Sequence, residues 1–106
     1  MKHPIVSFII PVFNETVFLR NCLNSILNLD YPKDKLDVVV VGNISKGVID
    51  DFPNVRFFVK EGNQPSARNF AISEAKGEYI FNFNAHAVAD KSLVSVVLPK
   101  FNGFVD

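Results

Sequence analysis

The architecture of this chain is set by residues 62–86, which read GNQPSARNFAISEAKGEYIFNFNAH. Pro65 has a fixed φ and no amide hydrogen to lose, so it suits the first position of a helix, with Asn63 or Gln64 as the cap. Gly77 predicts where that helix ends, because glycine readily adopts the left-handed conformation that commonly closes a helix. Between these limits, apolar residues at three- and four-residue intervals form one stripe: Ala67, Phe70, Ala71 and Ala75.

A strand is expected directly after this helix. Residues 78–83 are rich in aromatic side chains, which favour extended structure, and Asn84 and His86 fall where the strand should end. Asn82 shares a strand face with Asn84, and if it is buried it needs a hydrogen-bond partner or costs about 1 to 3 kcal/mol. The segment therefore couples a capped helix to a strand that ends in polar residues.

The preceding half of the chain alternates in the same way. Residues 5–10 are almost continuously apolar, which is typical of a strand covered on both faces in a parallel sheet. Asn14 or Thr16 can cap the next helix, and further strands are predicted over residues 36–41 and 55–59. Two neighbouring rows form the apolar face of that helix: Phe18, Cys22 and Ile26, then Leu19, Leu23 and Leu27. This alternation predicts an α/β fold with a Rossmann-like, mostly parallel sheet flanked by helices.

Two segments are less regular. Residues 42–47 are expected to form a loop, with Gly42 and Gly47 serving a turn. Residues 90–98 fit either a helix capped by Asp90 and ended by Pro99, or a strand, because apolar residues also alternate there. In an open α/β sheet a ligand lies beyond the carboxyl ends of the strands. Four loops are expected to converge at that edge: residues 11–15, 42–47, 61–68 and 84–88.

Composition limits the classes of function. The 106 residues, 48% of them hydrophobic, suit one domain, and eleven basic residues balance eleven acidic ones without a basic cluster. We therefore expect no nucleic-acid partner and no anionic membrane surface as partner. No apolar stretch approaches the roughly 20 residues that span a bilayer. Cys22 is the single cysteine, so it forms no internal disulfide, and a reducing cytoplasm is the expected location.

Three motifs resemble the nucleotide-sugar-binding half of the family 2 glycosyltransferases, and the resemblance covers nearly the whole chain. In that family an apolar strand ends in Pro-x-(Tyr/Phe)-Asn-Glu, and an Ala-Arg-Asn helix leads through Gly-Glu-Tyr-Ile to a strand ending in Asp-x-Asp. The matching residues here are Pro11, Phe13, Asn14 and Glu15, then Ala67, Arg68 and Asn69, then Gly77, Glu78, Tyr79 and Ile80. The resemblance implies part of a GT-A fold and also favours a helix over residues 90–98.

The chain departs from the family pattern at two positions. Asn84-Ala85-His86 replaces Asp-x-Asp, whose carboxylates hold the ribose and a divalent metal that bridges the diphosphate. Gly42 replaces an Asp that hydrogen-bonds the base, and Asn43 or Ser45 could substitute, since each has a donor and an acceptor. Both losses reduce the negative charge expected at the site.

The resemblance implies a nucleoside-diphosphate sugar as ligand, and it nominates residues for binding it. These are Pro11, Phe13, Glu15, Asn43, Arg68, Asn84 and His86. Arg68 would meet the diphosphate, although it could equally pair with Glu61 or Glu15 on the surface. Asn84 and His86 would hold manganese or magnesium, weakened by the lost carboxylates. The alternative is that Asn84 only hydrogen-bonds the backbone at a strand end and that His86 is an ordinary surface histidine.

No residue is assigned a catalytic role. In the family, the general base and the acceptor site come from the second half of a domain about twice this long, so this single domain, residues 1–106, is expected to be inactive alone. It is read either as part of an active enzyme that glycosylates an acceptor hydroxyl or as a degenerate, non-catalytic binding or assembly domain. An exposed sheet edge could also support a homodimer. A nucleotidyltransferase relative would need a glycine-rich loop after the first strand, and residues 11–15 contain no glycine. The adjacent acids Asp50 and Asp51 receive no role.

Overall fold

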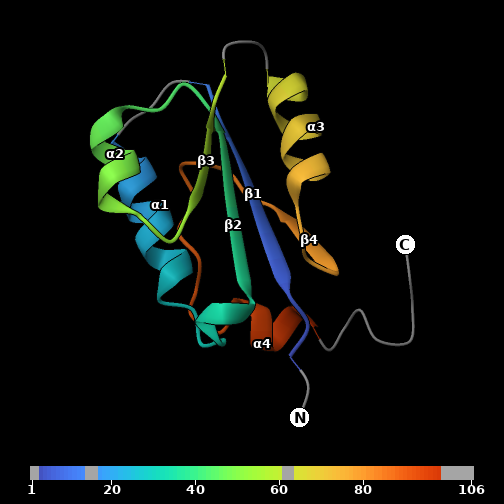
Figure 1. Cartoon of the computed structure of the whole chain (residues 1–106). Coiled ribbons are helices and arrows are strands. Elements are labelled where there is room, and N and C mark those ends of the chain that lie inside the picture. The colour runs from blue at the N-terminus through green and yellow to red at the C-terminus, as the bar shows by residue number, and fades with distance from the viewer. Residues whose placement is uncertain (1–2, 14–16, 61–63, 99–106) are drawn as a thin grey trace.

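The computed structural model describes residues 3–13, 17–60 and 64–98. Within these residues, four strands alternate with four α-helices, and one short 3₁₀ helix, η1, precedes the second strand. The elements are β1 (Val6–Val12), α1 (Val17–Leu27), η1 (Lys33–Lys35), β2 (Leu36–Gly42), α2 (Lys46–Asp51), β3 (Arg56–Val59), α3 (Gln64–Glu74), β4 (Tyr79–Asn82) and α4 (Leu93–Val97). Figure 1 shows α1 and α2 on one side of the sheet and α3 on the other.

The sheet is entirely parallel, with strand order β3-β2-β1-β4, so the predicted α/β fold is confirmed. The central pair β1 and β2 is in register over seven residues, from Val6 opposite Leu36 to Val12 opposite Gly42. β4 pairs with only the first part of β1, from Val6 opposite Tyr79 to Ile9 opposite Asn82. The two sides of β1 are therefore covered unequally at its carboxyl end.

The core has two layers because successive residues of a strand point to opposite faces of the sheet. On the larger side, Phe8 and Ile10 of β1 belong to the same buried cluster as the helix-α1 residues Leu19, Cys22 and Leu23. On the other side, Ile9 of β1 and two valines of β2 form a second cluster with Ala71 of α3. The apolar stripe predicted for the α3 helix contacts this second cluster, which confirms the helical spacing.

Several local predictions were wrong. Residues 42–47 are not all loop, because α2 begins at Lys46 and Gly47 lies inside it. Ser45 caps this helix by accepting a hydrogen bond from the Val48 amide. Phe18 was expected in the apolar face of α1, but it is 51% exposed and lies outside the core cluster. Its ring lies beside that of His86, with the centroids 5.6 Å apart. Asn82 is exposed, so the burial cost considered for it does not arise.

Gly77 differs from its prediction in an instructive way. Gly42 is the residue with positive φ among those described, so Gly77 does not close α3 in a left-handed conformation. A Cβ at Gly77 would instead lie 2.6 Å from the Ser7 nitrogen and 2.8 Å from the Ile5 oxygen. Glycine is needed there because the chain passes directly over β1.

The ambiguous segment 90–98 contains the helix α4, as the family resemblance favoured. Its N-terminal cap position is Ser92 rather than Asp90, and Asp90 instead accepts hydrogen bonds from the Ser92 amide at 2.9 Å and hydroxyl at 2.6 Å. The predicted contributions of Asn14, Thr16, Asn63 and Pro99 to helix ends lie outside the described residues.

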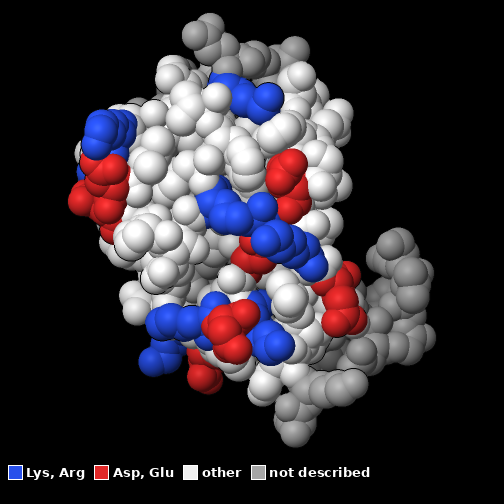
Figure 2. Space-filling view, in the orientation of Figure 1, with Lys and Arg blue, Asp and Glu red and all other residues white. Residues whose placement is uncertain are grey.

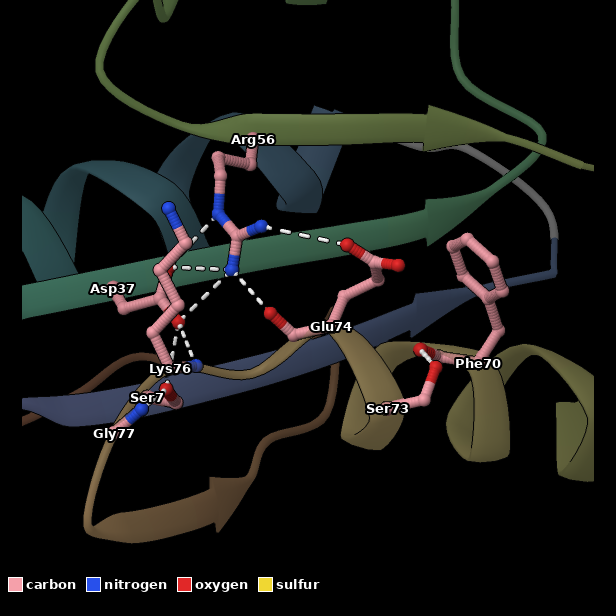
Figure 3. Close-up of polar contacts among 8 residues, drawn as sticks. All are labelled: Ser7, Asp37, Arg56, Phe70, Ser73, Glu74, Lys76 and Gly77. Carbon is pink, nitrogen blue, oxygen red and sulfur yellow. Dashed lines mark hydrogen bonds and ion pairs between the residues drawn. The ribbon is translucent and has the colours of Figure 1, made fainter.

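A polar network fixes the end of α3 against the amino ends of the strands (Figure 3). The Asp37 carboxylate accepts from Arg56 Nε at 3.0 Å, from the Ser7 hydroxyl at 2.7 Å and from the Lys76 amide at 2.9 Å. Arg56 also donates to the Glu74 carbonyl at 2.6 Å. Because each polar group in this half-buried cluster has a partner, the connection from α3 to β4 is held in one position.

Charges of both signs are mixed on the face of the molecule drawn in Figure 2. Figure 2 shows Lys and Arg side chains interspersed with Asp and Glu on the face drawn, without a large patch of one sign. On α2, Asp50 pairs with Lys46 and Asp51 pairs with Arg20, so both acids serve surface ion pairs. Among residues 3–13, 17–60 and 64–98, none of the helices combines the length and apolar character needed to cross a membrane.

Candidate functional site

The carboxyl ends of the strands lie at one edge of the parallel sheet, the edge toward which β1, β2 and β3 run in Figure 1. Phe13 follows β1 and is 62% exposed, Asn43 follows β2, and Lys60 follows β3. The helix α3 begins at this edge, after β3. The N-terminus of a helix carries unpaired amides and partial positive charge, which favours anions.

The end of β2 is built without a side chain. Gly42 has φ +143°, and a Cβ there would lie 1.9 Å from the Val12 carbonyl oxygen. That oxygen accepts from the Asn43 amide at 3.2 Å, while the Gly42 oxygen accepts from the Lys60 amide at 2.9 Å. Backbone hydrogen bonds thus join β1, β2 and β3 at the position where the family usually carries an Asp side chain.

The two proposed substitutes for that Asp are placed differently. Ser45 Oγ accepts from the Val48 amide at 3.5 Å as the cap of α2. Asn43 is exposed at the edge itself. Of the two, the geometry favours Asn43 as a hydrogen-bonding group for a ligand.

The segment after β4 forms a compact turn. Asn84 Oδ1 accepts from the His86 amide at 2.8 Å, and the Asn84 carbonyl accepts from the Ala87 amide at 2.9 Å. Cys22 Sγ lies 3.6 Å from the same carbonyl. The sequence left open that Asn84 only hydrogen-bonds the backbone at a strand end, and this hydrogen bond is present.

These residues do not form a ready site for a divalent cation. Asn84 Oδ1 is already engaged by the His86 amide, and the exposed His86 ring packs beside Phe18 with centroids 5.6 Å apart. Within the described ranges, no three His, Cys, Asp or Glu side chains are grouped so as to hold a metal. Magnesium and calcium sites are built mainly from carboxylate and carbonyl oxygens, and one amide oxygen with one imidazole falls short of such a site.

Arg68 lies in α3, close to the helix start. Its side chain is partly buried, and its Nε is buried without a hydrogen-bond partner. The proposed partners Glu61 and Glu15 lie outside the described residues. A buried guanidinium N–H without a partner is costly, so an anionic ligand that accepted from it would gain binding energy.

Lys60 was missed by sequence reasoning. It is exposed directly after β3, and its Nζ lies 4.3 Å from the centre of the Phe70 ring of α3. This contact places a second cation at the edge where α3 begins. The available signal was positional, because Lys60 follows its strand as Asn43 follows β2.

The predicted site residues therefore differ in where they lie. Phe13, Asn43, Asn84 and His86 are at strand ends and at least partly exposed, whereas Pro11 is buried within β1. Arg68 stands on α3 at the same edge. Glu15 lies outside the described residues. Cys22 lies beneath the β4 turn, and burial raises the pKa of its thiol to about 11, so it is not a nucleophile at neutral pH.

A parallel sheet with polar strand ends and a helix start at one edge is the architecture of many nucleotide-binding domains. The family model for glycosyl transferase family 2 matches residues 7–104. The chain therefore belongs to glycosyltransferase family 2, as its motifs indicated.

Individual relatives agree with this assignment. A Methanococcus voltae protein, dolichyl N-acetyl-alpha-D-glucosaminyl phosphate 3-beta-D-2,3-diacetamido-2,3-dideoxy-beta-D-glucuronosyltransferase, is 29% identical over 100 residues, which is 84% of this chain and 31% of that protein. The Haloferax volcanii glycosyltransferase AglE is 34% identical over 84 residues, 70% of this chain and 28% of its own length. The chain thus spans less than a third of these relatives.

Solved structures show the same fold. The Pyrobaculum calidifontis mannosyltransferase PcManGT, in complex with GDP-Man and Mn²⁺, has a TM-score of 0.75 and 26% identity, covering 92% of this chain and 32% of that one. Residues 1–349 of S. aureus TarS have a TM-score of 0.79 at 24% identity, covering 89% of this chain and 31% of that one. At this identity the second likeness shows the fold alone.

Proposed function

We propose that the carboxyl edge of this sheet binds a nucleoside-diphosphate sugar, the donor for glycosyl transfer to an acceptor hydroxyl. The observation that carries the proposal is Arg68, whose buried Nε lacks a partner near the start of α3 in a family 2 chain. A diphosphate accepting from Arg68 would satisfy that N–H and would be favoured by the helix dipole. The GDP-Man complex of PcManGT, a structural neighbour, supports this class of ligand.

The other edge residues have complementary chemistry for such a ligand. Phe13 offers an exposed aromatic face for a base or ribose, and Asn43 offers a donor and an acceptor for the base. Lys60 adds positive charge at the same edge. Glu15 remains the proposed partner of Arg68 or of a ligand hydroxyl, and Pro11 shapes the edge from within β1.

Binding of a divalent metal by Asn84 and His86 is retained as a proposal. The Mn²⁺ in the PcManGT complex makes a divalent metal reasonable for the family. Asn84 and His86 would be its ligands here, yet the turn that occupies Asn84 Oδ1 argues for weak binding. We therefore propose that nucleotide affinity depends less on manganese or magnesium than it would with two carboxylates.

We further propose that residues 1–106 are the donor-binding part of a longer glycosyltransferase domain and transfer no sugar alone. The support is coverage, since the matched relatives are more than three times as long as the aligned region. The general base and the acceptor site would come from outside this region. The second candidate, a non-catalytic binding domain, is favoured by the missing carboxylates at positions 84 and 86.

Thermal unfolding tests donor binding. The chain is heated with UDP, GDP, CDP and their sugars, each with and without manganese. Ligand at about 100 times its dissociation constant adds roughly 2.7 kcal/mol, which raises the midpoint by on the order of 10 °C in a domain of this size. We expect a clear rise with one nucleotide, and no rise with any of them would contradict the proposal.

Two variants sharpen this test. Arg68→Gln removes the guanidinium and should abolish most of the nucleotide-dependent rise. Arg20→Gln is the matched control, because Arg20 pairs with Asp51 where α1 and α2 meet and is not a candidate ligand residue. A rise that is equal in both variants would remove Arg68 from the site.

Assembly and location are also proposals. β4 is an edge strand of the described sheet, so its outer edge could pair with that of a second copy. Light scattering over a wide concentration range should show a dimer, and a monomer at every concentration would refute this assembly. A cytoplasmic location is proposed because the single cysteine, Cys22, is buried and unbridged.

A further inference from the structure

The ladder between β1 and β4 stops early. Its last paired residues are Ile9 and Asn82, although β1 continues to Val12 and stays paired with β2 to its end. The final hydrogen bond on the β4 side runs from the Phe83 amide to the Ile9 carbonyl at 2.9 Å. Beyond this bond the two chains follow different paths.

Backbone direction explains why the ladder stops there. In a strand, residues two apart direct their amide and carbonyl groups to the same neighbour. The Ile9 carbonyl faces β4, while the Val12 carbonyl accepts from Asn43 beyond β2. The backbone of Pro11 therefore faces β4, and the next rung would need an amide N–H at this position to donate to the Phe83 carbonyl. Proline has no N–H, so this rung is missing.

The chain after Phe83 uses its polar groups differently. Asn84 and His86 form the turn described above, which keeps them at the edge rather than in a longer β4. A prolonged β4 would place the Asn84 amide and side chain in strand geometry and would break the 2.8 Å contact with the His86 amide. The absent donor on β1 thus favours the turn over the strand.

We propose that Pro11 is a positioning residue of the donor site, which withholds the N–H that would extend β4 and so keeps Asn84 and His86 in the turn at the carboxyl edge. This inference rests on the proposed function of that edge. Pro11 is buried in β1 and need not touch the ligand to act in this way.

Pro11→Val tests the inference, because valine supplies the N–H, suits a strand and fills the buried volume. We expect the amide that this substitution introduces to be protected from hydrogen exchange by the Phe83 carbonyl. The ring contact between Phe18 and His86, 5.6 Å in the native chain, should be lost, and affinity for the best donor nucleotide should fall at least tenfold. Pro11→Ala repeats the test with a smaller side chain in case valine prevents folding.

Pro53→Ala is the matched control, since Pro53 is exposed between α2 and β3 and its replacement also loosens the unfolded chain. It should leave the ring contact and nucleotide affinity unchanged. If the amide introduced by Pro11→Val exchanges as fast as an exposed one, the inference is overturned, as it is by unchanged affinity. If the native chain binds no nucleotide, the proposed function fails, whereas exchange and the ring contact still decide whether Pro11 holds the turn.

Discussion

At Gly42 the absence of a side chain is a steric requirement. The φ of +143° is costly for any other residue, and a Cβ would overlap the Val12 carbonyl oxygen at 1.9 Å. The position therefore cannot be returned to the Asp common in the family without moving β1 and β2 apart. Base recognition at this edge has to use neighbouring groups such as Asn43.

Gly42→Ala should lower the free energy of unfolding by roughly 3 kcal/mol or more, because strain and overlap add. Urea denaturation measures this change. Gly47→Ala is the matched control, since Gly47 lies in α2 and the nearest heavy atom to an added Cβ is 3.6 Å away. It should be neutral or stabilise by up to about 1 kcal/mol. Equal effects of the two substitutions would contradict the steric account.

The thiol of Cys22 should be unreactive in the folded chain. Burial raises its pKa to about 11, so at pH 8 the reactive thiolate is scarce as well as inaccessible. A chromogenic disulfide reagent should label Cys22 at least a hundredfold more slowly in buffer than in concentrated urea. Similar rates in the two solvents would show that α1 does not cover this residue.

The role of Gly77 could not be read from its neighbours in the sequence. The sequence suggested that Gly77 ends a helix, but α3 already ends at Glu74, and glycine is needed at position 77 because of contact with Ser7, 70 residues away. Local patterns do not contain such contacts. Phe18 was misplaced for the same reason, since its neighbour His86 comes from the other end of the chain.

Among the elements, α3 is joined to three strands by the Asp37 network. Ser7 belongs to β1, Asp37 to β2 and Arg56 to β3, and Arg56 donates to the Glu74 carbonyl at the end of α3. The Asp37 side chain is 10% exposed and that of Arg56 is 29% exposed, so the pair is largely removed from water. Removing one partner leaves a partly buried charge without its counter-ion.

Asp37→Asn should therefore lower the free energy of unfolding at pH 7 by about 2 to 4 kcal/mol. Asp50→Asn serves as the control, because its ion pair with Lys46 is exposed and should contribute less than about 1 kcal/mol. Chemical denaturation of both variants gives the comparison. Equal, small losses would mean that the Asp37 network does not hold α3.

The same network predicts a pH dependence. Burial by itself would raise the pKa of Asp37, but hydrogen bonds from the Lys76 amide, the Ser7 hydroxyl and Arg56, with the Arg56 charge, lower it below its ordinary value. Its contribution to stability is thus complete above the unfolded pKa near 4 and is lost as pH falls through the folded value. The stability gap between the native chain and Asp37→Asn should shrink below about pH 4. A gap independent of acid pH would contradict this linkage.

Short elements were the least predictable from sequence. Ser45 is a recognisable N-cap, but Gly47 is a poor helix former, so the six-residue helix α2 was not predicted. The longer elements α1 and α3 followed their apolar spacing, and the strand cores followed their valine and isoleucine runs. An apolar repeat predicts an element more reliably than a single capping residue, because many side chains of the element are buried together.

For the whole molecule, the alternation of strands and helices was enough to predict a parallel α/β sheet with its ligand edge at the strand ends. The strand order β3-β2-β1-β4 and the early end of β4 depend on pairing between distant segments, which the sequence pattern alone does not specify. The candidate site was predicted as a set of strand ends. Its internal geometry, such as the bond between Asn84 and the His86 amide, is a product of tertiary structure.

The most direct test of the central proposal is an NMR titration of the ¹⁵N-labelled chain with UDP-sugars and GDP-sugars. We expect saturable shifts of the amides of Phe13, Asn43, Arg68 and His86 at the carboxyl edge, with the amides of the Asp37 network unchanged. Such a pattern would place the nucleotide where the strands end. No saturable shift with any donor, or shifts centred on the amino ends of the strands, would contradict a donor site at this edge.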